Sequence, residues 1–198
     1  NEVSILVHRA SINFIDLLIS RGLYQIRPEL PYVVGAEAAG EIIAVGANVT
    51  SLKVGDRVAT FDLTGAFGEI MVAKHWRTIK LPESIDFSTG AAILHNYLTA
   101  GYALKFRGQL NSGETLVVHG ASGGVGLAAL DLGRLWGANL IAGIGSAEKI
   151  VLAQDYGAKD IINYSAENVR ERINELTDGH GADIIFDPIV GEVFDQSL

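Results

Sequence analysis

The sequence predicts an α/β protein in which a β-rich part is followed by a parallel sheet with helices on both faces. Two observations support this prediction. The first 80 or so residues hold short β-branched runs between glycine-rich turns, and from about residue 85 apolar strand-like runs alternate with helical ones. Strands that are apolar throughout are typical of parallel sheets buried on both faces.

The composition excludes several classes of function. The net charge of −8 at pH 7 disfavours nucleic-acid partners, because binding along phosphates requires clustered Lys and Arg. The absence of cysteine excludes disulfides, thiol nucleophiles and thiolate metal sites, and it fits a reducing cytoplasm. No apolar run reaches the ~18–20 residues that span a bilayer. We therefore expect a cytoplasmic protein with neither a nucleic-acid nor a membrane partner.

The β-rich part is predicted to contain four strands, because β-branched residues are enriched there and partly alternate with polar ones. These strands are residues 4–10, 38–46, 56–61 and 68–73. Between the first two strands, residues 13–24 are predicted to form a short helix or an irregular turn that carries polar groups.

The second part is predicted to alternate strands with helices, which builds a doubly wound parallel sheet. The strands are residues 115–120, 139–145, 160–164 and 182–188. The helices are residues 123–136, 146–157 and 165–177, and another helix begins at residue 191. Ser146 stands at the expected N-cap of the second of these helices.

Residues 120–126, GASGGVG, connect the first strand of this second part to its first helix. In a strand–turn–helix unit such a loop cradles the phosphates of a dinucleotide, which the helix N-terminus attracts. Gly123 lets the backbone approach a pyrophosphate, and Gly126 lets the helix pack closely on the strand. Ala121 replaces the first glycine of G-x-G-x-x-G, and the alternative is a tight turn without a ligand. The predicted cofactor-binding residues of the loop are Ser122, Gly123, Gly124, Val125 and Gly126.

The end of the second strand of this part indicates which dinucleotide binds. An NAD site places Asp or Glu there, about 20 residues after the loop, for the ribose 2′-hydroxyl. Residues 143–146 are GIGS, so no carboxylate would repel a 2′-phosphate. Lys149 is predicted to supply positive charge, and Ser146 and Tyr164 to border the pocket. NADP(H) is therefore favoured. The alternatives are that Glu148 binds the ribose 2′-hydroxyl of NAD and that Lys149 is an ordinary solvated surface residue.

Several stretches together resemble one known family. They are ASINFIDLLISRGLY, LPYVVGAEAAGEIIAVGANVTSLKVGDRV, NYLTA, LNSGETLVVHGASGGVGLAALDLGRLWGA, GAKDIINY, ELTDGHGADIIFDPIVG and FDQSL. The sequence resembles the medium-chain dehydrogenase/reductase superfamily, in its zinc-independent NADPH:quinone oxidoreductase branch (zeta-crystallin-like). The resemblance implies a GroES-like β-rich catalytic domain, a Rossmann NADP-binding domain and a substrate cleft between them. We place the two domains at residues 1–90 and 91–198.

The sequence departs from the zinc-dependent members of that superfamily. Those members carry a G-H-E motif and a cysteine among their catalytic ligands, whereas this chain has GAE at 35–37 and no cysteine. A catalytic zinc needs three protein ligands, and the five histidines stand singly without metal-ligand spacing. We therefore expect no metal in the site.

The resemblance also implies catalytic residues on both sides of the cleft. Asn13 and Thr99 match positions that hold the nicotinamide end of the cofactor. Tyr24 matches a position that borders the acceptor, where it donates a hydrogen bond or a proton, and Asp16 is expected to orient the segment around Asn13. Taken without the resemblance, Asn13 is interpretable as a helix cap, Tyr24 as an aromatic packed over the β domain and Thr99 as a core helix residue. His119 ends a strand, and we interpret it as a structural histidine that satisfies backbone groups.

Three departures from the family pattern fall on the substrate side. Leu94–His95 replaces a proline and an aliphatic residue, Gly101 replaces an aromatic residue and Val190 replaces a glycine. The chain begins without a methionine and carries four strands of a six-stranded Rossmann sheet, so we expect a longer protein, truncated here at its C-terminus. The missing strands normally form a dimer edge, and we expect a homodimer of the full-length protein.

The function expected from these observations is hydride transfer from NADPH to a quinone or an α,β-unsaturated carbonyl compound. Such acceptors take hydride without a metal, through positioning and electrostatics. An enoyl reductase that acts on acyl thioesters is one alternative. A non-catalytic NADPH-binding protein, used structurally or as a redox sensor, is another.

Overall fold

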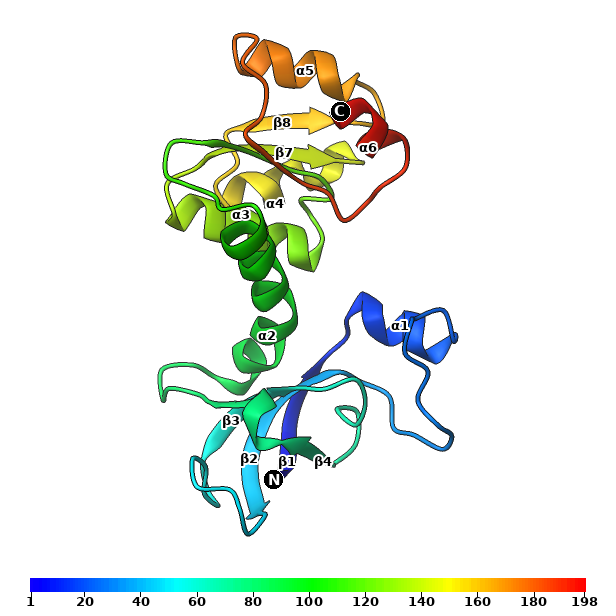
Figure 1. The fold of residues 1–198 in the computed structure, drawn as a ribbon, viewed down its shortest axis with the longest axis vertical. Coiled ribbons are helices and arrows are strands. Elements are labelled where there is room, and N and C mark those ends of the chain that lie inside the picture. Colours follow the sequence, from blue (N-terminus) through cyan, green and yellow to red (C-terminus); the bar gives the residue numbers. More distant parts are fainter. The chain divides into compact units, whose positions relative to one another are not determined.

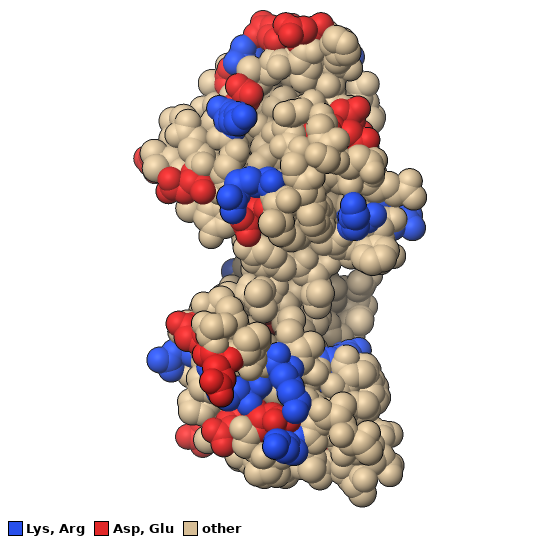
Figure 2. All heavy atoms as spheres, turned by 90° about the vertical axis from the view of Figure 1, so that its left-hand side faces the viewer, with Lys and Arg blue, Asp and Glu red and all other residues tan.

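The computed structural model describes residues 1–198, and the chain divides into two compact units, Asn1–His95 and Asn96–Leu198. The boundary falls within helix α2 (Phe87–Gly101). No helix is both long enough and apolar enough to cross a membrane. On the face in view in Figure 2, side chains of both charge signs are scattered over each unit, with broad uncharged areas between them.

The first unit is built on a five-stranded antiparallel sheet in the order β4-β1-β2-β3-β5 (Figure 1). Its elements are β1 (Glu2–Ser11), α1 (Phe14–Ser20), β2 (Glu37–Val45), β3 (Arg57–Phe61), β4 (Ile70–Lys74), the 3-10 turn η1 (His75–Arg77) and β5 (Thr78–Lys80). The four predicted strands are confirmed, with ends shifted by at most two residues, and the polar connection after β1 forms the short helix α1. The three-residue edge strand β5 was not predicted.

Alternation along β1 and β2 builds the core of this unit. Val3, Ile5 and Ile42 are fully buried and pack together with residues of the following turn and strand, whereas Leu6 and Ile43 face outward. This is the period of two that strand geometry imposes when one face of a sheet is covered.

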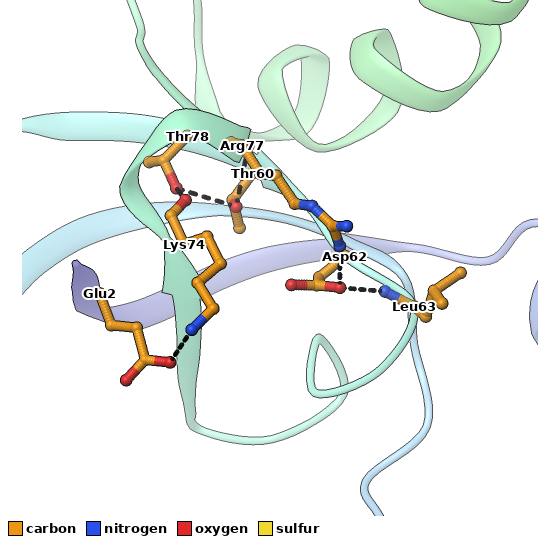
Figure 3. Close-up of polar contacts among 7 residues, drawn as sticks. All are labelled: Glu2, Thr60, Asp62, Leu63, Lys74, Arg77 and Thr78. Carbon is orange, nitrogen blue, oxygen red and sulfur yellow. Dashed lines mark hydrogen bonds and ion pairs between the residues drawn. The ribbon is translucent and has the colours of Figure 1, made fainter. Parts of the chain in front are cut away.

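Polar side chains join neighbouring segments of the first sheet (Figure 3). The contacting pairs are Glu2 with Lys74, Asp62 with Arg77 and Thr60 with Thr78. The two ion pairs are at least partly exposed, so solvent screening keeps their contribution to stability small. The threonine hydroxyls are buried and lie 3.0 Å apart across β3 and β5, so one donates to the other. The Arg77 carbonyl at 3.2 Å from Thr60 and the Lys74 carbonyl at 3.1 Å from Thr78 are further acceptors.

The second unit is built on a four-stranded parallel sheet in the order β8-β7-β6-β9. Its strands are β6 (Thr115–Val118), β7 (Asn139–Ile144), β8 (Asp160–Asn163) and β9 (Ile184–Phe186). Its helices are α3 (Gly124–Leu135), the 3-10 turn η3 (Ala147–Lys149), α4 (Ile150–Asp155), α5 (Val169–Leu176) and α6 (Glu192–Ser197). All four strands were predicted, with ends that differ by at most two residues.

Helices cover both faces of this parallel sheet, as the apolar strands predict. Leu116 and Val118 pack in a core that includes α3 and α4, whereas Val117, between them, packs with α5. In Figure 1 the helices α3 and α4 lie on one side of β7 and β8, and α5 and α6 lie on the other. Successive residues of β6 thus feed opposite faces, which defines a doubly wound α/β sheet.

Three helical regions differ from the sequence prediction. No bounds were predicted for α2, which was considered only as a helix around Thr99, and the π-helical turns that follow it, Tyr102–Arg107, were not predicted. The predicted helix 146–157 is divided into η3 and α4, and Ser146 holds the N-cap position without a side-chain capping bond. The predicted start of helix 165–177 was wrong. Asn168 accepts a hydrogen bond from the Glu171 N–H at 3.1 Å, so the helix begins only at Val169.

Val190 is a strained residue after β9. Its φ is +60°, a value that β-branched side chains rarely adopt, and the side chain is exposed. Glycine is free of this strain, which gives a physical reason for the glycine that the family pattern has at this position.

Candidate functional site

The GASGGVG loop leaves β6 and enters α3, a helix of twelve residues. Gly123 is the N-cap in extended conformation (φ −83°, ψ 164°), and the Leu127 N–H donates to its carbonyl at 2.8 Å. The N–H groups of Gly124, Val125 and Gly126 precede this first helical hydrogen bond, so the helix offers them no acceptor. Gly123 and Gly124 are exposed, and Ser122 and Val125 are half-buried, so bare backbone faces outward at the helix N-terminus. This arrangement fits the phosphates of a dinucleotide.

Gly126 lies where helix and strand approach most closely. A Cβ atom on this residue would lie 2.3 Å from the carbonyl oxygen of Gly120 and 2.8 Å from the Cα of Ala121. Both neighbours are backbone atoms, so nothing can move aside without displacing the loop. The close helix–strand approach expected at Gly126 is therefore present.

The carboxyl end of β7 brings Ser146, Lys149 and Tyr164 into one region. The Tyr164 ring lies against Gly145, since a Cβ there would meet it at 3.0 Å. The Lys149 N–H donates to the Ser146 carbonyl at 3.1 Å, and the Lys149 side chain is exposed. Burial raises the pKa of the Tyr164 hydroxyl, and the nearby Asp187 carboxylate adds to this effect.

His119 is fully buried at the end of β6, and its partner is a side chain rather than the backbone groups that we expected. Its Nε2 lies 2.9 Å from the Ser197 hydroxyl. That hydroxyl donates its hydrogen bond to the Val193 carbonyl at 2.7 Å. Nε2 therefore donates, and Nδ1, which carries no proton, is buried beside Gly143 without a hydrogen-bond partner. The structural interpretation of His119 holds, with a different partner.

Burial lowers the pKa of His119 below 6.5, while Asp187 opposes this shift. As the pH is lowered, His119 is protonated in the unfolded chain before it is protonated in the folded one. Its contribution to the free energy of unfolding is therefore complete above pH 6.5. That contribution is lost as the pH falls from 6.5 through the lowered folded-state pKa. We expect the free energy of unfolding of the second unit to decrease more steeply in wild type than in His119→Gln as the pH is lowered. Urea titrations at pH 7.5 and below 6 measure the slope, with the exposed His180→Gln as matched control, and equal slopes in wild type and His119→Gln contradict the assignment.

The first unit holds Asn13 and Tyr24, and the second unit holds Thr99. Asn13 is the N-cap of α1, as the helix-cap interpretation requires, but its amide Nδ2 donates to the Ser11 hydroxyl at 2.8 Å. Asp16 accepts from the Asn13 N–H at 2.7 Å and so ties this segment together, as expected. Tyr24 is half-buried and packs against an apolar cluster that includes Ile15 and Ile19 of α1.

Thr99 is exposed on helix α2, so the interpretation of this threonine as a core residue is wrong. Leu94 and His95 lie within helix α2, which begins at Phe87.

The sequence prediction missed Glu37, a carboxylate buried in β2. Its Oε1 accepts from the N–H groups of Leu94 at 2.5 Å and His95 at 3.2 Å. Its Oε2 accepts from Ser11 Oγ at 3.1 Å and Asn13 Nδ2 at 3.4 Å. Burial raises the pKa of the Glu37 carboxyl, while the four donors oppose that shift. The available signal was a lone acid within the small apolar run VVGAEAAG, where a strand is buried on both faces.

A cavity of about 700 Å³ in the second unit lies at the amino ends of the parallel strands, the edge opposite the glycine loop. Arg134, Lys159 and His180 line it together with Asp160 and Asp183. In open α/β sheets ligands bind outside the carboxyl ends of the strands, so this cavity is separate from the candidate nucleotide site.

An antiparallel β unit, followed by a doubly wound sheet with a glycine-rich loop at its first strand, has the fold of the Rossmann class of dinucleotide-binding proteins. Residues 1–83 match the family model described as an alcohol dehydrogenase GroES-like domain, and residues 124–198 match the one described as a zinc-binding dehydrogenase. Over its full length the chain is 41% identical to quinone oxidoreductase of Pseudomonas aeruginosa. It is 42% identical to a quinone oxidoreductase-like protein 2 homolog of Nematostella vectensis, also over its full length.

The chain belongs to the medium-chain dehydrogenase/reductase superfamily, in its quinone oxidoreductase branch. The Escherichia coli quinone oxidoreductase, solved with NADPH, superposes with a TM-score of 0.93 at 35% identity, over 100% of this chain and 60% of the other. The CurK enoyl reductase superposes with a TM-score of 0.91 at 32% identity, over 100% of this chain and 61% of the other. The chain spans 61% of the length of the Pseudomonas protein and 54% of the Nematostella protein.

The donor set of this chain does not fit the zinc named in the second family model. The chain has no cysteine, and no group of three His, Asp or Glu side chains is placed to hold a metal ion. Zinc sites in proteins use three or four such ligands.

Proposed function

We propose that the protein is a zinc-free oxidoreductase that transfers hydride from NADPH to a quinone or an α,β-unsaturated carbonyl acceptor. The observation that carries the proposal is the exposed backbone of the GASGGVG loop at the N-terminus of α3. The NADPH named with the Escherichia coli relative supports the choice of cofactor. NADPH supplies the hydride when it is bound, and the chain supplies binding, orientation and electrostatics.

The second unit is proposed to hold the phosphate end of the cofactor. Ser122 and the residues of the GGVG turn, 123–126, donate backbone N–H groups to the pyrophosphate. Lys149 and Ser146 take the 2′-phosphate, and Tyr164 closes the side of the pocket. The lack of a carboxylate at residues 143–146 supports this assignment, because an acid there would repel the phosphate.

The catalytic residues are proposed from the family resemblance. Asn13 and Thr99 hold the nicotinamide end, and Tyr24 borders the acceptor and donates a hydrogen bond or a proton to the oxyanion that hydride transfer creates. On the same basis we propose residues 1–90 as part of the catalytic domain and residues 91–198 as part of the cofactor domain. A cytoplasmic homodimer is proposed for the full-length protein.

The test is oxidation of NADPH, with NADH in parallel, against a panel of quinones and α,β-unsaturated carbonyl compounds, with and without a chelator. Turnover that prefers NADPH and is indifferent to the chelator supports the proposal. If NADPH binds and no acceptor consumes it, the reductase proposal fails and a non-catalytic binding protein takes its place.

A second candidate function is reduction of an enoyl thioester. The similarity to the CurK enoyl reductase supports this candidate. An enoyl thioester of a small acyl carrier, added to the same panel, discriminates between the two. Turnover on the thioester that exceeds turnover on every quinone and free enone favours the enoyl reductase.

Lys149→Ala tests the choice of cofactor. Loss of a charge-assisted contact to the 2′-phosphate is expected to raise the KM for NADPH about tenfold or more and to leave that for NADH unchanged. Lys159→Ala is the matched control, since Lys159 is also exposed in the second unit but lines the cavity at the opposite edge of the sheet. Equal KM values for NADPH in wild type and Lys149→Ala assign the lysine to the solvated surface.

A further inference from the structure

We infer that Glu37 is a positioning residue for the Asn13 amide, holding it in one orientation while it also anchors helix α2. The inference rests on the proposed function only for what Asn13 contacts during turnover. The placement of the two side chains stands on the geometry of the first unit alone.

The Glu37 carboxylate joins three segments that are distant in sequence. From β2 it reaches the end of β1 and the N-cap of α1 through Oε2, where Ser11 and Asn13 donate to it. Through Oε1 it reaches α2, where the backbone N–H groups of Leu94 and His95 donate to it. Glu37 is completely buried and Asn13 nearly so, so water does not compete for these contacts.

The direction of every hydrogen bond in this cluster follows from the chemistry of the donors. The backbone N–H groups of Leu94 and His95 donate only, and so does the Asn13 Nδ2. Donors therefore face both carboxylate oxygens, and an ionised carboxylate is the side chain that accepts at both ends. The Ser11 hydroxyl accepts a hydrogen bond from Asn13 at 2.8 Å and donates one to Glu37 at 3.1 Å, so it forms a second link between Asn13 and Glu37.

This arrangement fixes which end of the Asn13 amide faces Glu37. An amide rotated by half a turn would direct its oxygen at the Glu37 carboxylate, which is repulsive, and would compete with Glu37 for the single proton of Ser11. Asn13 consequently has one stable orientation. In the proposed function, that orientation decides whether a ligand at Asn13 meets a donor or an acceptor.

Glu37→Gln separates the two functions of the carboxylate. The introduced amide has one accepting end and one donating end. Because the N–H groups of α2 are fixed, the accepting end is expected to stay on Leu94 and His95, which preserves the fold. The donating end then faces the Asn13 Nδ2, which is also a donor. The Asn13 amide is therefore expected to rotate by half a turn, so that its oxygen faces the introduced amide. Glu41→Gln is the matched control, since Glu41 lies on the same strand β2 and is exposed.

The first measurement needs no turnover. In the apoprotein, the side-chain amide resonances of Asn13, assigned by their loss in Asn13→Ala, are expected to shift in Glu37→Gln and to stay in place in Glu41→Gln. Thermal unfolding of both variants confirms that they are folded. If the Asn13 resonances are the same in folded Glu37→Gln as in wild type, the inference is overturned whatever the enzyme does.

The second measurement is a double-mutant cycle on NADPH-dependent turnover. Glu37→Gln is expected to lower kcat about 10- to 100-fold through misplacement at Asn13, while NADPH affinity changes little because the phosphate loop is untouched. In the Asn13→Ala background the same substitution is expected to cost nothing further. Additive losses contradict an action through Asn13. If wild type turns over no acceptor at all, the proposed function fails, while the resonance measurement still decides the role of Glu37.

Discussion

Gly126→Ala is expected to destabilise the second unit by about 3 kcal/mol and to weaken NADPH binding at least about tenfold. The reason is that the new Cβ would lie 2.3 Å from the Gly120 oxygen, an atom of the loop itself. The helix must move away from β6, and the N–H groups at its N-terminus move with it. Urea unfolding followed by Trp136, the single tryptophan of the second unit, measures the first effect, and titration with NADPH measures the second.

Gly123→Ala is the control that separates packing from ligand approach. At Gly123 a Cβ would meet one atom, the Gly120 oxygen, at 3.3 Å, a tight contact that a small shift of the loop relieves, and the φ of −83° suits alanine. The loss of stability is expected to stay within about 1 kcal/mol, the usual cost of alanine at an N-cap. NADPH affinity is nevertheless expected to fall, because the methyl group stands where the pyrophosphate approaches. Undiminished affinity in Gly123→Ala would falsify the proposed cradle.

Ile42→Ala is expected to destabilise the first unit by about 3 kcal/mol, within the range for large-to-small changes in a core. Ile42 is 0% exposed and packs between β1 and the turn that follows β2. Ile43→Ala is a closely matched control, because Ile43 is the next residue of the same strand and is 41% exposed. It is expected to cost about 0.5 kcal/mol or less.

Trp76 is the single tryptophan of the first unit, so a Trp136→Phe background reports the unfolding of that unit alone. Similar losses of stability in Ile42→Ala and Ile43→Ala are incompatible with a one-sided core for this sheet.

The elements that were predictable from the sequence are those whose pattern is set by local geometry. The strands from β1 to β4 and from β6 to β9 follow runs of β-branched residues, and α3 follows directly from the GASGGVG loop. Helix α2 has no charged side chain and contains Gly90, so its sequence carries neither a polar face nor a strong helix preference. The start of α5 is set by Asn168, whose side chain caps the helix instead of forming part of its first turn.

The candidate site was predictable where it is made of backbone and unpredictable where it depends on contacts between distant segments. The cradle at residues 123–126 is encoded in a contiguous motif. Glu37, by contrast, acquires its role from donors on β1, α1 and α2, up to 58 residues away along the chain. The partner of His119, Ser197, is 78 residues away. Contacts of such sequence separation leave no periodic trace in the sequence.

The strand order β8-β7-β6-β9 also sets an order of assembly during synthesis. The three strands β6, β7 and β8 pair with neighbours in the order in which they emerge, whereas β9 returns to the free edge of β6. The Thr115 N–H, at the start of β6, donates a hydrogen bond to the Asp183 carboxylate at 2.7 Å, and Asp183 is synthesised 68 residues later. At roughly 5–20 residues per second, that edge stays unpaired for several seconds on each new chain. During this interval β6 is open to pairing with other chains. Crowded expression at high temperature is therefore expected to expose this protein to aggregation through β6, whose second neighbour, β9, is made only after β7 and β8.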